Sequence, residues 1–199
     1  MHLLISSVAE IFASSDNSMA RRVAANLAGL REYKFTAHFP TTLPLQHLHA
    51  TLANPGAHPL TQDIHALAHH LPWQVLSQDI APVDLMTGLT YCQIVGPQGL
   101  IRDNRLKMGC YFQIPELFYP SHTHNAEEVY FVLSGTALWQ KDNAEFTAQS
   151  PGTLIHHLPN QPHAMHTQKE PLLAIWAWIG DIGFESYEIH QGQDIKQKI

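Results

Sequence analysis

Apolar side chains recur at helical intervals through the first third of the chain. Because residues three and four apart lie on the same side of a helix, such groups predict amphipathic helices. Proline and glycine turn signals between them predict an irregular segment over residues 36–60. The three predicted helices are marked by these groups: Val8, Ile11 and Phe12; Val23, Leu27 and Leu30; Ile64, Leu67, Ala68 and Leu71.

From about Tyr91 onward the pattern changes to short runs rich in Val, Ile, Phe, Tyr and Trp. Each run is bounded by Gly, Pro, Asn or Asp, which is typical of short strands joined by turns. Many short strands with frequent turn signals predict an antiparallel sandwich or barrel. The predicted strands are 107–114, 128–133, 136–140, 154–157, 172–179 and 184–189.

This change of pattern divides the chain into two parts. Residues 1–90 are expected to form an N-terminal helical extension, and residues 91–192 a β-barrel. The 199 residues, of which 45% are hydrophobic, are enough for one substantial domain with such an appendage.

Charge and composition narrow the class of partner. Eleven basic and seventeen acidic residues give a net charge of −6 without any basic run, which argues against binding to nucleic acid or anionic membranes. No stretch approaches the roughly 20 apolar residues that span a bilayer. The charge balance leaves a small molecule as the expected partner. Two cysteines without CxxC spacing and a start without a basic n-region predict a cytoplasmic protein.

The segment 119–135 carries the strongest chemical signal. In an extended strand His122 and His124, two residues apart, project to the same side. By the same argument Glu128 and Tyr130 share one face of the next strand. Buried imidazoles and a carboxylate are best satisfied by a divalent metal ion, and these ligand types suit Zn, Fe, Mn, Co and Ni alike.

A further ligand is expected from a distant strand. His163, eleven residues after Gly152, has the most suitable spacing. Three neighbouring histidines are the alternatives: His156, His157 and His166.

The aromatic residues near these histidines allow two interpretations. An aromatic residue in a strand packs in a core about as often as it binds or reacts, which applies to Tyr130 and to Tyr119. Trp139, Trp176 and Trp178 are expected in the core or in the wall of a pocket.

The spacing of these residues resembles a known superfamily. The pattern His122-x-His124-x3-Glu128-x6-Gly135 resembles the first motif of the cupins, and Gly152-x10-His163 has the spacing of the second. The resemblance implies a mainly β protein, a cupin-type antiparallel β-barrel (double-stranded β-helix) with an N-terminal α-helical extension.

The motifs also depart from the cupin pattern in detail. Glu116 stands where the first motif usually opens with glycine. Leu158 and Asn160 stand where the second usually has proline and glycine, with Pro159 shifted by one position.

A narrower resemblance covers nearly the whole chain. The run from Tyr119-Pro to Gly135, the tetrapeptide 162–165 and the motif Ala177-Trp178-x-Gly180 look like the cupin-class dimethylsulfoniopropionate (DMSP) lyases and their relatives. The resemblance implies a β-elimination that converts DMSP to dimethyl sulfide and acrylate. It also implies a metal site made of these residues: His122, His124, Glu128, Tyr130 and His163.

The resemblance implies roles for the aromatic residues too. Tyr119 is carried over as the general base, and a nearby cation would favour its phenolate. Tyr130 is the rival base, as a metal-bound phenol displaced by substrate. Trp178 and Trp139 are expected to hold the sulfonium by cation–π attraction, worth about 0.5 to 2 kcal/mol.

Three other classes stay open at this stage. They are an Fe(II) dioxygenase, an isomerase or epimerase, and a non-catalytic binding protein that holds a small molecule in the barrel. A small carboxylate is the expected substrate, and a homodimer through the barrel or the helices would be ordinary.

Overall fold

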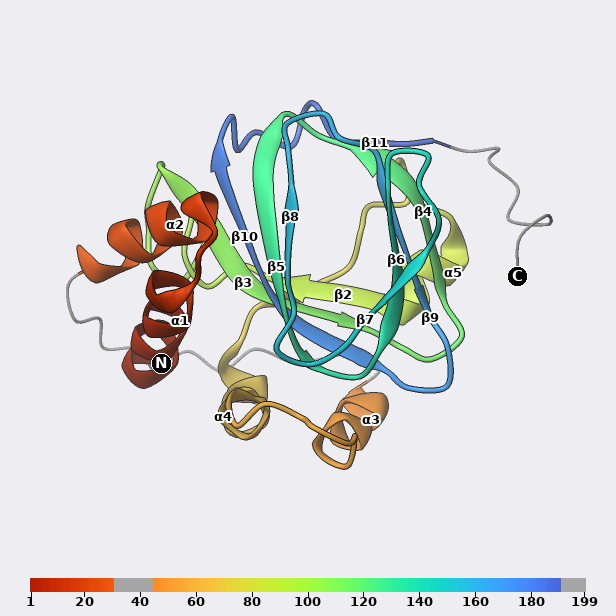
Figure 1. The fold of residues 1–199 in the computed structure, drawn as a ribbon, viewed down its shortest axis with the longest axis horizontal. Coiled ribbons are helices and arrows are strands. Elements are labelled where there is room, and N and C mark those ends of the chain that lie inside the picture. The colour runs from red at the N-terminus through yellow and green to blue at the C-terminus, as the bar shows by residue number, and fades with distance from the viewer. Residues whose placement is uncertain (31–44, 191–199) are drawn as a thin grey trace.

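The computed structural model describes residues 1–30 and 45–190, and within them two antiparallel β-sheets face each other (Figure 1). The first sheet has six strands in the order β1-β2-β3-β10-β5-β8, and the second has five in the order β11-β4-β9-β6-β7. The strands are β1 (Trp73–Gln74), β2 (Leu89–Cys92), β3 (Leu106–Gln113), β4 (Phe118–Thr123), β5 (Ala126–Ser134), β6 (Ala137–Lys141), β7 (Thr147–Gln149), β8 (Leu154–His157), β9 (His163–Thr167), β10 (Leu172–Gly180) and β11 (Glu188–Ile189). This arrangement confirms the cupin-type barrel.

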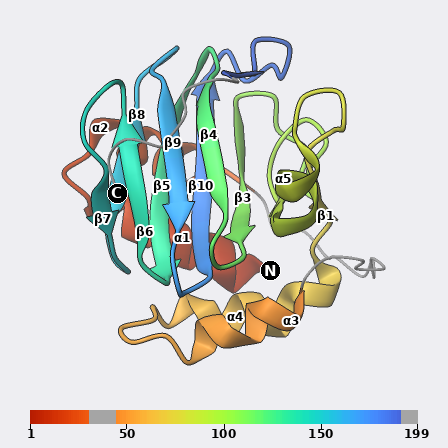
Figure 2. The same cartoon turned by 90° about the vertical axis from the view of Figure 1, so that its right-hand side faces the viewer.

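Helices lie outside the barrel (Figure 2). They are α1 (His2–Ser14), α2 (Ser18–Ala28), α3 (Leu45–Leu48), α4 (Leu60–Leu67) and α5 (Val83–Gly88), with 3₁₀ helices at His49–Leu52 and Ala68–His70. Apolar residues of α1, α2 and α4 join one core cluster with the six-stranded sheet. Among the described residues no helix is long and apolar enough to cross a membrane.

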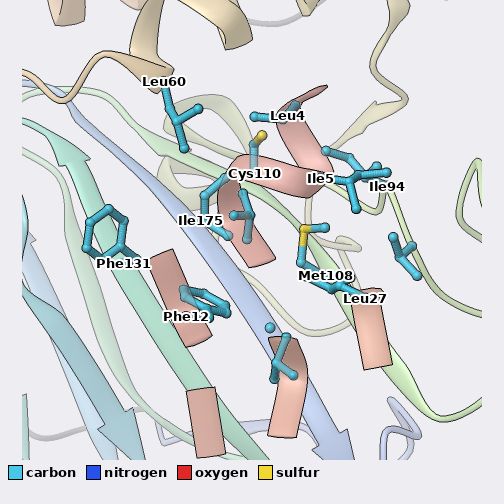
Figure 3. Close-up of a cluster of buried hydrophobic side chains, with 14 of the residues drawn as sticks. Leu4, Ile5, Phe12, Leu27, Leu60, Ile94, Met108, Cys110, Phe131 and Ile175 are labelled. Carbon is cyan, nitrogen blue, oxygen red and sulfur yellow. The ribbon is translucent and has the colours of Figure 1, made fainter. Parts of the chain in front are cut away.

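Strand β5 is covered on both faces, which explains its nearly continuous apolar sequence. Val129, Phe131 and Leu133 pack against the helices, and Figure 3 shows Phe131 and Phe12 in that layer. Tyr130 and Val132 point the other way, into the core between the two sheets. The period-two alternation predicted for this strand is therefore confirmed.

Most predicted elements are found within a few residues of their expected bounds. The helices over residues 8–12, 23–30 and 64–71 correspond to α1, α2 and α4 with its 3₁₀ extension. Five of the six predicted strands correspond to β3, β5, β6, β8 and β10. These elements have strong periodicity or long apolar runs, which are the most reliable local signals.

Two local predictions are wrong. The strand expected over 184–189 is reduced to β11, because residues 184–187 form a turn closed by the Tyr187 amide donating to the Phe184 carbonyl over 3.2 Å. The irregular segment expected over 36–60 contains α3 and a 3₁₀ helix in its described part, while residues 36–44 lie outside the described residues. The division at residue 90 stays a prediction.

The start of α2 gives a first test of the helical layer. The Asn17 side chain accepts a hydrogen bond from the Ala20 amide over 2.9 Å, so it satisfies one amide that would otherwise have no helical partner. We expect Asn17→Ala to lower the free energy of unfolding by about 1 kcal/mol. Urea denaturation would measure the change, and Asn17→Ser, which retains a capping oxygen, should remain near wild type. Equal losses in both variants would contradict the capping role.

Candidate active site

The two histidines of the first motif lie where β4 meets its neighbours. His122 is in β4 and is paired in register with His163 of β9, whereas His124 follows directly after the strand. All three side chains are almost fully buried. The structure thus brings these histidines together from segments about forty residues apart in the sequence.

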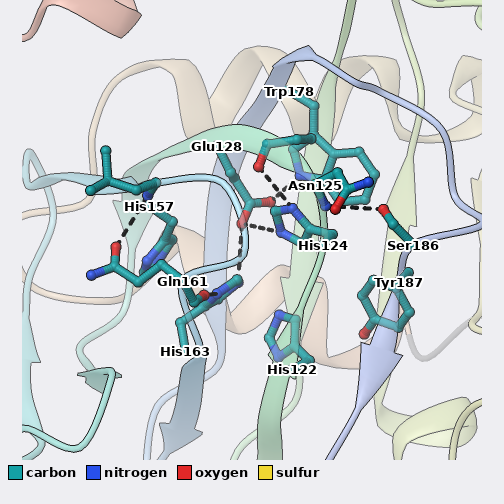
Figure 4. A network of polar contacts seen from close by, with 12 residues as sticks. His122, His124, Asn125, Glu128, His157, Gln161, His163, Trp178, Ser186 and Tyr187 are labelled. Atoms are coloured by element: carbon teal, nitrogen blue, oxygen red, sulfur yellow. Dashed lines mark hydrogen bonds and ion pairs between the residues drawn. The ribbon is translucent and has the colours of Figure 1, made fainter.

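Glu128 of β5 lies at the centre of this group (Figure 4). Its Oε1 accepts a hydrogen bond from Nε1 of Trp178 over 2.6 Å. Its Oε2 lies 3.2 Å from Nε2 of His124 and 3.1 Å from Nε2 of His163. Ligand atoms of these three residues all lie within 4.8 Å of one another.

Backbone carbonyls fix the tautomer of each imidazole. The Nδ1 atoms of His122, His124 and His163 lie 2.9, 3.0 and 2.8 Å from the carbonyl oxygens of residues 120, 126 and 161. Since a carbonyl can only accept, each Nδ1 must carry the hydrogen and donate it. The neutral rings therefore keep their Nε2 lone pairs for another partner, as metal-binding histidines do.

One inner nitrogen of this group lacks a hydrogen-bond partner among the described residues. Nε2 of His163 is buried and forms no hydrogen bond with the described residues, although an acceptor oxygen of Glu128 is 3.1 Å away. A neutral Nε2 and a carboxylate oxygen are both acceptors, so neither satisfies the other. A cation between them would satisfy both, and two imidazoles with a carboxylate suit a divalent metal. His124, Glu128 and His163 are the residues that could hold it.

His122 is close to this group but not part of its converging atoms. Its ring lies 4.0 Å from that of His163, centroid to centroid, and 6.4 Å from that of His124. Burial, followed by the nearby His163, lowers the pKa of His122 well below its ordinary value. The ring therefore stays neutral and packs against His163.

Glu128 stays ionised despite its burial. Burial raises the pKa of this carboxyl, but positive charge on His124 and His163 would outweigh that effect and hold the pKa well below its ordinary value. A cation held between neutral rings would act in the same direction. A carboxylate at this position, buried and lining the cavity, would favour a cation beside it.

Tyr119 reaches the same interior through a β-bulge. Residues three apart on a regular strand face opposite sides, but the pairing of β4 with β9 shifts register between Tyr119 and His122. Their rings consequently stack with centroids 4.1 Å apart. The Tyr119 hydroxyl shares a hydrogen bond with that of Tyr187. Burial, followed by Tyr187 and Glu128, raises the pKa of Tyr119 well above its ordinary value.

Tyr130 lies two residues after Glu128 on β5, so both side chains point to the same side of the strand. Its ring packs edge-on against Tyr111 and Trp139, with centroids 5.5 and 5.1 Å away. Burial, then the charge of Glu128, raises the pKa of Tyr130 well above its ordinary value. The protein groups around either tyrosine therefore favour the neutral phenol.

These side chains line a cavity of about 570 Å³. Its wall includes Tyr119, His122, His124, Glu128, Tyr130 and Trp178, all of which the sequence had singled out. The wall also contains residues that sequence reasoning did not single out for chemistry, among them Tyr91, Gln93, Lys107, Tyr111, Glu185 and Tyr187. They belong to no spacing motif, and only the run of aromatics near residue 184 could have drawn attention to Tyr187.

The two tryptophans expected to hold substrate lie in different places. Trp178 lines the cavity. Its ring centroid lies 4.3 Å from that of His124 and 5.1 Å from the Lys107 ammonium. Trp139 is not part of the described cavity wall. It is buried behind Tyr130 and donates its Nε1 hydrogen to Nε2 of His157 over 3.0 Å. This position gives Trp139 packing contacts, and its substrate contact stays a prediction.

The departures from the cupin motifs coincide with special backbone positions. Glu116 and Asn160, which stand where the motifs usually have glycine, have φ angles of 56° and 59°. Glycine adopts positive φ without steric cost, and asparagine tolerates it better than most residues. At both positions this chain therefore has a non-glycine residue in a conformation that glycine adopts more readily.

Comparisons with known proteins point to one family. A family profile described as dimethylsulfoniopropionate lyase matches residues 15–174. The lyase DddQ of Ruegeria pomeroyi is 33% identical over 92 residues, which are 46% of this chain and 45% of that protein. A putative lyase, DddL of Cereibacter sphaeroides, is 33% identical over 116 residues, which are 57% of this chain and 48% of that protein. The matched segments span about half the length of these curated relatives.

Solved structures extend the likeness to almost the full chain. A crystal structure from a study of the DMSP lyases RdDddP and RnDddQII has a TM-score of 0.68 and 26% identity, covering 96% of this chain and 100% of that one. DddQ from Ruegeria pomeroyi DSS-3 has a TM-score of 0.70 and 20% identity, covering 94% and 98% of the two chains, which supports the fold alone. Since the profile matches well over half of the chain, the protein belongs to the dimethylsulfoniopropionate lyase family.

Proposed function

We propose that this protein is a metal-dependent carbon–sulfur lyase that cleaves DMSP to dimethyl sulfide and acrylate by β-elimination. The observation that carries the proposal is the convergence of His124 and Glu128, which line a tyrosine-rich cavity, with the buried His163 beside them, in a chain of this family. A tyrosine base and a bound metal are parts of the proposal.

The elimination needs one base and a departing sulfide. The base removes a proton from the carbon next to the substrate carboxylate, and that electron pair forms the new carbon–carbon double bond as the carbon–sulfur bond breaks. The sulfonium leaves with the bond electrons as neutral dimethyl sulfide, and acrylate remains. The proton stays on the base until it passes to solvent.

His124, Glu128 and His163 would hold the metal, with Tyr130 as a further oxygen ligand and His122 orienting His163 through their ring contact. When bound, a divalent ion supplies a carboxylate-binding Lewis acid, stabilises charge developing next to that carboxylate and favours the phenolate of an adjacent tyrosine.

We assign the base to Tyr119, with Tyr130 as the rival. Either hydroxyl can donate in the hydrogen bond that Tyr119 and Tyr187 share. In addition to burial, Tyr187 raises the pKa of Tyr119 where Tyr119 is the donor, and the proposal requires the opposite direction, in which Tyr187 donates to a Tyr119 phenolate. The ring stack on His122 holds the phenol in one orientation. A fixed base with a donor behind it is a suitable arrangement for general base catalysis.

Trp178 has two roles in this proposal. Its indole holds Glu128 by the hydrogen bond to Oε1, and its ring forms part of the wall that contacts the sulfonium. The Lys107 ammonium already lies near the same ring, so it competes with a second cation there. Tyr91, Tyr111 and Tyr187 offer further aromatic surface for the sulfonium methyl groups.

Headspace detection of dimethyl sulfide tests the proposed function. We expect purified protein to release dimethyl sulfide from DMSP. Chelation should lower the rate of release by at least about tenfold, and the rate should recover when Zn, Fe, Mn, Co or Ni is added singly. Stoichiometric metal binding without release would refute the lyase activity and leave the metal site. Oxygen consumption that accompanies turnover would instead favour a dioxygenase.

A further inference from the structure

A row of three side chains crosses the inner face of the six-stranded sheet. In the strand registers Trp178 of β10 pairs with Lys107 of β3 on one side and with Glu128 of β5 on the other. All three line the cavity. Neighbouring strands are about 4.8 Å apart, so the backbone of Lys107 is roughly 10 Å from that of Glu128.

Lys107 is the one lysine or arginine in the described wall of this cavity. The side chain is half-buried, and its ammonium lies 5.1 Å from the Trp178 ring centroid and 5.7 Å from that of Phe184. Burial lowers the pKa of Lys107, whereas the charge of Glu185 opposes this effect. Among the described contacts Lys107 and Glu185 form no ion pair within 4.0 Å. The Lys107 ammonium can therefore still bind an anionic partner.

The cavity is also larger than DMSP requires. Its volume of about 570 Å³ is within the range of pockets for drug-sized ligands. DMSP is far smaller than such ligands, and its sulfonium gains nothing from a lysine, because like charges repel. DMSP alone therefore explains neither the Lys107 ammonium in the wall nor the full volume of the cavity.

We propose that Lys107 forms an anion subsite at the far end of the row, so that the cavity takes β-sulfonio carboxylates whose departing sulfide carries a second carboxylate. This inference rests on the proposed function for the inner end, where the first carboxylate binds. The elimination is unchanged: the base takes the proton next to the first carboxylate, the carbon–sulfur bond breaks, and the sulfide leaves with its electrons and its own carboxylate. Glu185 competes with the incoming anion for Lys107.

Calorimetric binding to the metal-loaded protein tests the subsite without requiring turnover. The probes are α,ω-dicarboxylates of increasing length, each compared with the monocarboxylate of equal chain length. We expect one dicarboxylate length to bind about tenfold more tightly than its monocarboxylate, as one charge-assisted contact would give. The gain should disappear in Lys107→Met, persist in Lys107→Arg and grow in Glu185→Gln.

Two results would overturn the inference. One is equal binding of every mono- and dicarboxylate pair to wild type, and the other is a preference that survives in Lys107→Met with metal content unchanged. Failure of the subsite is separable from failure of the lyase. A Lys107-dependent preference in a protein that releases no dimethyl sulfide would keep the subsite and refute the elimination, whereas release without the preference would do the reverse.

Discussion

His163→Ala is expected to lower the release of dimethyl sulfide by at least about 100-fold and to reduce bound metal well below one ion per chain. Loss of an outer partner of a metal ligand already costs 10- to 100-fold in affinity or activity, so loss of one of three converging groups should cost more. Water or another side chain cannot easily replace His163 as a metal ligand, because its imidazole is fully buried and its Nε2 faces Glu128. Metal analysis after gel filtration and headspace detection would measure the two effects together.

The matched control lies three residues further along the same strand. His166 of β9 faces the other side, where its ring meets Phe118 edge-on at 6.0 Å. His166→Ala removes the same imidazole from the same strand, so it should retain metal and activity. A His163→Ala protein that keeps full metal content would show that the metal is held elsewhere, and equal losses in both variants would point to damage of the strand.

The strand that carries Glu128 could be predicted from the sequence because its alternation is regular. Period two alone separates the apolar residues Val129, Phe131 and Leu133 from Glu128 and Tyr130. The first set packs in the core beneath the helices, and the second lines the cavity. The spacing of the second motif also predicted that His163 would lie near the histidines of the first motif. Local sequence contains both kinds of information, since neither requires knowledge of the remaining chain.

Other parts of the site depend on contacts that no local pattern encodes. Tyr119 reaches the cavity through a bulge that breaks period two. Trp139 has the same residue type as Trp178 and also lies in a strand, yet it is buried behind Tyr130. Lys107 becomes part of the cavity only because β10 lies between β3 and β5.

The 181–187 loop illustrates the same limit. Its aromatic residues suggested a strand, but Phe184 and Tyr187 stack on each other with centroids 4.7 Å apart instead of alternating across a sheet. The loop is tied to the turn between β4 and β5, where the backbone N–H of Asn125 donates to Ser186 Oγ over 3.0 Å. This contact holds Tyr187 beside Tyr119, and it depends on two segments sixty residues apart.

Tyr119→Phe is expected to lower kcat for dimethyl sulfide release by about 10²- to 10⁴-fold, the range for loss of a general base. The change removes only the hydroxyl. The remaining ring should still stack on His122 at 4.1 Å and on Tyr111 at 6.4 Å, so metal content should stay close to wild type. The free energy of unfolding should fall by about 1 to 3 kcal/mol, because the Tyr187 hydroxyl loses its buried partner. Steady-state kinetics by headspace detection, with metal analysis on the same samples, would separate a lost base from a lost metal.

Two further phenylalanine variants decide between the tyrosines. Tyr187→Phe removes the hydrogen-bond partner of Tyr119 but not the base, so it should cost about tenfold, as one lost hydrogen bond to a charged oxygen would. Tyr130→Phe should retain more activity than Tyr119→Phe if Tyr119 is the base. If Tyr119→Phe stays active while Tyr130→Phe loses release at full metal content, the base is Tyr130. Tyr119 would then act through its stack on His122, as a positioning residue for the histidine next to His163.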